Sequence, residues 1–191
     1  MIDAIVEGIK DRVSVAIKVN QSVGIQVPEN RHDELIKALF NFMLSNPNDA
    51  WTFVTASDTY HNVSKTVDEF SEQPNIKFID CISRAAGVSE LQGNCTYIES
   101  PTMLEIVSLE IMNNFRGVKD EVEKFVIIDS LSALMVYNDP EIIREFASLL
   151  LNKTQAQNIH IATILIEEEA DSNKLIQMND KVVVLRDSFI E

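Results

Sequence analysis

Side chains that could bind or transform a ligand occur in five short stretches of the sequence. Each stretch lies in or directly after an apolar run that is typical of a buried strand. They are Pro28-Glu29-Asn30-Arg31, Ser57-Asp58, Asp80, Asp129-Ser130 and Glu167-Glu168-Glu169. Four of the five are acidic, which is unfavourable for a nucleotide unless a metal ion intervenes. The candidate cofactor contacts among them are Asn30, Arg31, Asp58, Asp129 and Ser130.

The acidic stretches raise the question of a metal ion. Asp80, Asp129 and the glutamates at 167–169 would hold a divalent ion only if the fold brought them together. A run of glutamates is more often a solvated loop edge, and no HExxH motif or Cys/His zinc spacing is present. We therefore predict no metal site.

Covalent chemistry is poorly supported by the sequence. Ser57, Ser130 and Ser132 lie outside any GxSxG elbow, so a hydrolase triad is not expected. Cys81 lies in or beside a predicted buried strand, where a structural thiol is more common than a reactive one. His160, in the alternating sequence NIHIATI, is expected to be a strand residue and not a ligand. We predict no catalytic residues.

The composition restricts the class of protein. The chain has 191 residues, of which 46% are apolar and 24% charged, enough for one sizeable core in a single soluble domain over residues 1–191. A net charge of -14 would repel a phosphate backbone, so no nucleic-acid partner is expected. Cys81 and Cys95 have no CxxC spacing and no leader is visible, which favours a reducing cytoplasm. No apolar run reaches the roughly 20 residues that span a bilayer, so no membrane association is expected.

Helical and extended patterns alternate along the chain. An N-terminal helix is predicted over residues 1–12, and the alternation of Val13, Val15, Ile17 and Val19 predicts a strand that forms a hairpin with 23–27 through Asn20-Gln21-Ser22. Further helices are predicted at 33–44, 60–70, 103–115, 140–156 and near Lys174, with strands at 51–55, 76–82, 124–129, 159–166 and 180–185. Pro101 is expected in the first turn of its helix, and Asp139-Pro140 at the start of another. Strands separated by helices predict a three-layer α/β/α sandwich with a mostly parallel sheet.

Several segments resemble one family of ATPases. The stretch KFVIIDSLSALMVYND at 124–139 resembles the Walker B strand of RecA, RadA and KaiC-type ATPases. FIDCISRAAG at 78–87, NCTYIESP at 94–101 and DKVVVL at 180–185 extend the resemblance to archaeal KaiC and RadA relatives. It covers roughly 23–185 and implies a RecA-like fold in which Asp129 holds the water shell of Mg²⁺ beside nucleotide phosphates. On the residues alone, Asp129 could equally cap the following turn by accepting backbone N–H bonds.

The chain departs from this family at two positions that ATP hydrolysis needs. A phosphate loop has the pattern GxxxxGK[ST], whereas the corresponding turn reads PENRHDE, without glycine or lysine and with three added acids. KaiC-like enzymes place a glutamate pair after the second strand, where this chain reads TASDT. Ser57 cannot act as that base, and the shorter side chain of Asp58 would displace the carboxylate by about one C–C bond, where a misplacement of roughly 1 Å is already costly.

Three functions remain open. We predict a non-catalytic RecA/KaiC-like domain that acts as a regulatory or protein-interaction module, with no cofactor and with a protein partner or self-association. The alternative is a nucleotide-binding sensor or weak ATPase that holds ATP with Mg²⁺ at a non-standard phosphate site. The third is an enzyme that acts on a small molecule through the acidic strand ends.

Overall fold

A single sheet organises the chain. The computed structural model describes residues 2–66, 73–88, 94–166 and 172–186. Within these ranges seven strands pair in the order β4-β3-β2-β5-β6-β1-β7, and every pairing is parallel. The strands are β1 (Ser22–Val27), β2 (Ala50–Thr55), β3 (Ile76–Asp80), β4 (Cys95–Tyr97), β5 (Lys124–Asp129), β6 (Ile159–Ile166) and β7 (Lys181–Val184).

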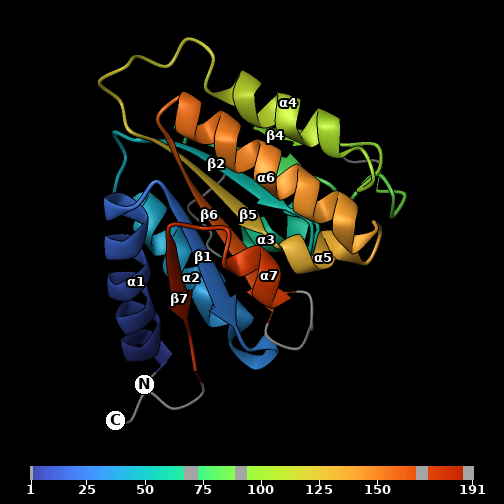
Figure 1. Cartoon of the computed structure of the whole chain (residues 1–191). Helices are drawn as coiled ribbons and strands as arrows, with labels where there is room; N and C mark the ends of the chain where they lie inside the picture. Colours follow the sequence, from blue (N-terminus) through green and yellow to red (C-terminus); the bar gives the residue numbers. More distant parts are fainter. Residues whose placement is uncertain (1, 67–72, 89–93, 167–171, 187–191) are drawn as a thin grey trace.

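Helices cover both faces of the sheet (Figure 1). One face carries α1 (Ile2–Val19), α2 (His32–Leu44) and α3 (Tyr60–Lys65), and the other carries α4 (Leu104–Asn114), α5 (Leu131–Met135), α6 (Pro140–Ala156) and α7 (Ser172–Ile176). A 3-10 turn, η1 (Glu29–Arg31), separates β1 from α2. The predicted three-layer α/β/α sandwich is therefore confirmed, and its sheet is parallel throughout the described residues.

Two apolar clusters, one on each face, hold the layers together. On the α1–α2–α3 face the rings of Phe40 and Phe53 lie 5.0 Å apart, and Trp51 stacks on Phe125 at 4.4 Å. Burial of each such side chain stabilises the fold by roughly 1.5–3 kcal/mol relative to its exposure. The near-continuous burial of β5 and β6 follows from helices packing on both sides of the sheet.

The predicted strand over Val13–Val19 and its hairpin with β1 are wrong. Helix α1 continues through Val19 because Val13 and Ile17, four residues apart, lie on its buried face. Val15 and Val19, the other two residues of the alternation, are 64% and 76% exposed, so the four residues do not form one face of a strand. Apolar residues at 13 and 17 satisfy both the helical and the extended period, and the longer helical pattern from Val6 decides between them.

Three predicted boundaries can be compared with the structure. Asp139 caps α6, since its carboxylate accepts from the backbone N–H of Glu141 at 2.9 Å, as its sequence predicted. Pro101 was wrongly placed in a first helical turn, because α4 begins at Leu104 after the N-cap Met103. The predicted helix 60–70 is confirmed over Tyr60–Lys65, and its residues 67–70 lie outside the described part of the chain.

No helix in the described ranges combines the length and the apolar character that crossing a bilayer demands.

Candidate functional site

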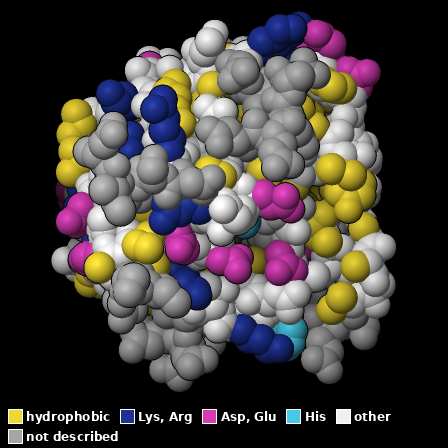
Figure 2. Space-filling model, turned by 90° about the horizontal axis from the view of Figure 1, so that it is seen from below, with side chains coloured by type: hydrophobic (Ala, Val, Ile, Leu, Met, Phe, Trp, Pro, Cys, Tyr) yellow, Lys and Arg dark blue, Asp and Glu magenta, His cyan; other side chains and the backbone are white. Residues whose placement is uncertain are grey.

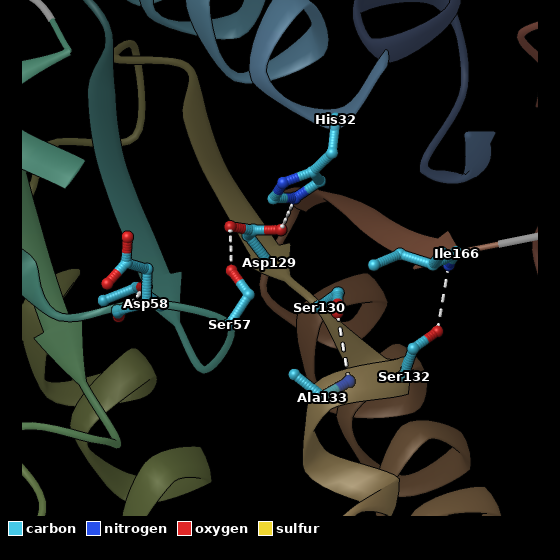
Figure 3. Close-up of polar contacts among 9 residues, drawn as sticks. His32, Ser57, Asp58, Asp129, Ser130, Ser132, Ala133 and Ile166 are labelled. Atoms are coloured by element: carbon cyan, nitrogen blue, oxygen red, sulfur yellow. Dashed lines mark hydrogen bonds and ion pairs between the residues drawn. The ribbon is translucent and has the colours of Figure 1, made fainter. Parts of the chain in front are cut away.

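The carboxyl ends of β1, β2 and β5 bring distant polar residues together at one edge of the sheet. Figure 3 shows His32 from the start of α2, Ser57 after β2 and Asp129 at the end of β5 pointing toward one another. The same edge, seen in Figure 2, carries a group of Asp and Glu side chains near its centre. Because all strands run parallel, this edge collects the predicted polar stretches, as expected for α/β sheets.

Asp129 is the centre of the site. Its carboxylate is 1% exposed, and its Oδ1 lies 2.5 Å from Nε2 of His32. Its Oδ2 accepts a hydrogen bond from Oγ of Ser57 at 2.7 Å. The backbone carbonyl of Asp129 also accepts from the N–H groups of Ala56 and Ser57, which joins the ends of β5 and β2. Both carboxylate oxygens therefore have partners within the protein.

His32 supplies the charge that a buried carboxylate requires. Burial lowers the pKa of His32, but the hydrogen bond to Asp129 and the negative charges of Asp129, Asp33 and Asp58 outweigh it, so the net shift is upward. When His32 is protonated, its imidazole donates from Nε2 to Asp129 as a charge-assisted hydrogen bond. The pair neutralises a carboxylate that would be costly to bury alone.

The order of these contacts differs from that of a catalytic triad. In a catalytic triad the serine hydroxyl donates to the imidazole, which removes its proton during attack. Here Ser57 donates to Asp129, and the imidazole of His32 bonds to the other oxygen of the same carboxylate. The order of the contacts is Ser57–Asp129–His32, so the imidazole does not contact the hydroxyl of Ser57.

Ser130 and Ser132 stabilise the chain after β5. Ser130 is the N-cap of α5, and its Oγ accepts from the N–H of Ala133 at 3.1 Å. Ser132 Oγ accepts from the N–H of Ile166 at 2.9 Å, which ties α5 to the end of β6. The capping role considered for Asp129 is thus performed by its neighbour Ser130. The peptide bond between Asp129 and Ser130 is cis.

The side chain of Arg31 forms hydrogen bonds within the protein. Its side chain is 9% exposed, its Nε donates to Glu34 at 2.9 Å, and its Nη1 donates to the carbonyl of Arg186 at 2.8 Å. These bonds fasten the turn after β1 to the chain that leaves β7. Asn30 is exposed in η1.

Asp58 lies apart from Asp129, as Figure 3 shows. It is exposed, and its Oδ1 accepts from the backbone N–H of Thr59 at 2.7 Å and from Nδ2 of Asn62 at 2.8 Å. These contacts support the first turn of α3, where a carboxylate also interacts favourably with the helix dipole. Of the predicted site residues, the structure therefore brings only Asp129 and Ser130 to the centre.

Asp80 belongs to a separate buried network. Its carboxylate is fully buried and accepts four hydrogen bonds, from the N–H groups of Tyr60, Ile82 and Ser83 and from Oγ of Ser83. Both Asp80 and Asp129 pair with Thr55 of β2, from opposite sides. Two strand spacings place their backbones roughly 10 Å apart. They therefore do not share an ion, and the bonds to Ile82 and Ser83 explain why β3 ends at Asp80.

The candidate metal ligands and the thiol of Cys81 can be compared with the structure. In residues 2–66, 73–88, 94–166 and 172–186, no group of three or more His, Cys, Asp and Glu side chains could hold a metal ion. The glutamates 167–169, considered as ligands, lie outside the described residues. Burial, with the nearby charge of Asp80, raises the pKa of the Cys81 thiol to about 12, so the thiol stays protonated and unreactive.

Sequence reasoning missed the two partners of Asp129. Neither His32 nor Ser57 is among the predicted cofactor contacts. The signal that could have found them is their position, because Ser57 lies just after β2 and His32 begins the helix after β1, and both strands end at the same edge as β5. Strand order is needed to show that β2 is the neighbour of β5.

Comparison with known proteins identifies the fold. No family model and no curated protein matches the sequence. Among solved structures, a KaiC-like protein from Pyrococcus horikoshii is similar at a TM-score of 0.59 and 10% identity, over 90% of this chain and 74% of that one. An uncharacterized protein from Pyrococcus horikoshii, in complex with an unknown peptide, is similar at 0.62 and 13%, over 90% and 80%. The chain therefore has a KaiC-like, RecA-like fold.

Proposed function

We propose that this chain is a non-catalytic RecA/KaiC-like domain that acts as a regulatory or protein-interaction module. The observation that carries the proposal is the state of Asp129. In the family that the sequence resembles, this aspartate faces the hydrated Mg²⁺ of a nucleotide. Here His32 and Ser57 bind both of its oxygens, so side chains of the protein occupy the positions where the water shell of a metal ion would bind.

The turn after β1 supports the same conclusion. Pro28 and the three-residue η1 join β1 directly to α2, which leaves no room for the eight-residue GxxxxGK[ST] cradle. No glycine lies between Pro28 and Glu34 to provide the positive φ angles of an anion nest. Glu29, Asp33 and Glu34 surround the start of α2 and would repel the phosphate that a helix N-terminus otherwise attracts.

No general base for water attack is offered by the residues after β2. The hydroxyl of Ser57 is bound to Asp129, and the carboxylate of Asp58 is bound to Thr59 and Asn62. Asp58 is also directed away from Asp129 in Figure 3. The residues at the positions of the phosphate loop and of the catalytic base thus form contacts within the protein. This arrangement is expected of a domain that is retained for its interaction surfaces.

Exposed apolar side chains provide such surfaces. Leu109 of α4 and Leu149 of α6 are 50% and 61% exposed, and Val15 and Val19 of α1 are exposed on the opposite face of the sheet. Val15 and Val19 line one groove together, and exposed apolar side chains that gather in this way are typical of interaction sites. One of the proteins with a similar fold was crystallised with an unknown peptide. The proposed ligand is accordingly a protein, either a partner or a second copy.

Titration calorimetry with ATP and Mg²⁺, together with an assay of phosphate release, tests the proposal. A KaiC-type ATPase with an intact phosphate loop serves as the positive control. We expect neither heat of binding nor turnover for this chain. Nucleotide binding would also stabilise the fold by about 2.7 kcal/mol at 100 times its dissociation constant, which urea unfolding would detect. Such stabilisation, or turnover in purified protein, would overturn the proposal in favour of the ATP-sensor alternative.

A further inference from the structure

A groove of about 440 Å³ lies between α1 and the edge strand β7. Figure 1 shows the two elements side by side, and β7 is the last strand of the sheet within the described residues. The groove is lined from α1 and the residue after it by Arg12, Val15, Ala16, Val19 and Asn20, and from β7 by Lys181, Val182 and Val183. It lies well away from the site around Asp129, so its features need a separate explanation.

The outer side of β7 presents unpaired backbone groups. In a parallel ladder, alternate residues direct their N–H and C=O groups to one neighbour. Leu185 N–H donates to the carbonyl of Gln26, so Val183 and Leu185 face β1. Val182 and Val184 therefore direct their backbone groups away from β1, toward the groove. No described strand pairs with them, which is the arrangement that accepts an added strand.

The wall opposite this edge is an apolar stripe of α1. Arg12, Val15, Ala16 and Val19 have the spacing i, i+3, i+4, i+7 and so lie on one face of the helix. Val15 and Val19 are 64% and 76% exposed, although the other face of α1 is buried in the core. A strand added to β7 would direct alternate side chains onto this stripe.

The charge of the groove indicates the chemistry of its occupant. Arg12 and Lys181 are exposed lining residues, and within the described part of the chain neither forms an ion pair. The chain as a whole carries a net charge of -14. A basic groove on an acidic protein favours an acidic ligand, and it disfavours a second copy, whose own Arg12 and Lys181 would be brought close.

We propose that this groove binds an extended segment of a partner protein, in which acidic and apolar residues alternate, as an added strand along β7. The proposal rests on the interaction role proposed above and specifies its surface and the class of partner. Backbone hydrogen bonds to Val182 and Val184 would fix the register of the segment. Its apolar residues would pack on Val15 and Val19, and its acids would pair with Arg12 and Lys181.

Selection from a displayed library of random eight-residue peptides on the immobilised whole chain tests the proposal. Enriched peptides are then synthesised and titrated by fluorescence anisotropy. Val15→Glu and Lys181→Glu alter the groove without touching the core. Their matched controls are Val136→Glu, at the exposed end of α5, and Lys174→Glu, on α7. Peptides methylated on alternate backbone nitrogens test the strand geometry, because they cannot pair with β7.

We expect the enriched peptides to alternate acidic and apolar residues. Their affinity should fall by about tenfold or more in both groove variants, and on backbone methylation, while the two controls bind as the unaltered chain does. Failure to enrich any peptide, or binding that neither groove variant weakens, would overturn the assignment of this surface. A homodimer in light scattering that Val15→Glu dissociates would also overturn it, by showing a second copy as occupant. None of these results bears on nucleotide binding, which tests the proposed function separately.

Discussion

The imidazole of His32 and the carboxylate of Asp129 connect the first residue of α2 to the last residue of β5. Their side chains are 17% and 1% exposed, so the contact lies at the boundary between the core and solvent. The residues are 97 positions apart in the sequence. This contact fixes the helix that follows β1 to the central strand, and its strength depends on the protonation of His32.

The stability of the fold should therefore depend on pH through His32. The pKa of His32 is raised in the folded chain above its unfolded value of about 6.5. A raised pKa contributes stability that is fully present below pH about 6.5 and is lost as the pH rises through the folded value. The free energy of unfolding in urea, measured between pH 5 and 9, should show this loss in the unaltered chain and not in His32→Gln.

His61→Gln provides the control for that measurement. His61 is exposed on α3, so its replacement removes the same titrating group without removing the contact to Asp129. The curve of His61→Gln should follow that of the unaltered chain. Parallel curves for His32→Gln and the unaltered chain across the whole range would contradict the pairing.

A double-mutant cycle should isolate the coupling between the same two residues. His32→Gln and Asp129→Asn remove one charge each and keep the approximate shape of the side chains. We expect a coupling energy on the order of 1–2 kcal/mol from urea unfolding at pH 6, because the two groups contact directly. In Asp129→Asn the pKa of His32, followed by NMR, should fall. Asp58→Asn paired with His32→Gln should give only a few tenths of a kcal/mol, since no hydrogen bond joins Asp58 to His32.

Local patterns were sufficient to predict most elements of the fold. The apolar runs of β5 and β6, the amphipathic pattern of α2 and the Asp139 cap of α6 each appear within a short window of sequence. The prediction is wrong at Val13–Val19, where apolar residues two and four positions apart fit both the period of a strand and that of a helix. The packing of α1 against α2 and the sheet shows that this segment is helical.

The candidate site was less predictable, because it depends on strand order. Sequence reasoning placed Asp129 at a strand end but could not show which neighbours meet it. That β2 and β5 are adjacent, and that α2 begins above them, follows from tertiary pairing and not from local preference. Arg31 illustrates the same limit, since its partner Arg186 follows the last strand of the sheet.

Asp80 should be a structural residue of large effect. Asp80→Asn leaves one carbonyl oxygen where two carboxylate oxygens now accept four hydrogen bonds, and it turns an NH₂ group toward donors. We expect a loss of about 3 kcal/mol or more in the free energy of unfolding. The matched change Asp58→Asn, at an exposed site, should cost about 0.5 kcal/mol or less. Equal effects of the two variants would show that the network of Asp80 is not formed.

Arg31 is expected to affect stability and not ligand binding. Arg31→Ala removes the bonds to Glu34 and to the carbonyl of Arg186, and should lower the free energy of unfolding by about 1–3 kcal/mol. Arg31→Lys keeps the charge but cannot reproduce both planar contacts, so it should recover only part of this loss. Arg144→Ala, on the exposed surface of α6, is the control. A nucleotide response in the unaltered chain that disappears in Arg31→Ala would instead identify Arg31 as a ligand contact.

Two glycines should respond in opposite directions to alanine. A Cβ at Gly24 of β1 would lie 2.5 Å from Cγ1 of Ile176, 2.9 Å from Nδ2 of Asn179 and 3.1 Å from the carbonyl of Ile176, so α7 and the turn after it would have to move. Overpacking of this kind costs roughly 1–3 kcal/mol. Gly8 lies exposed within α1 with no atom near its Cβ position, so Gly8→Ala should stabilise the helix by roughly 0.5–1 kcal/mol. Urea unfolding of both variants measures the difference. Tolerance of alanine at Gly24 would mean that α7 does not pack against β1.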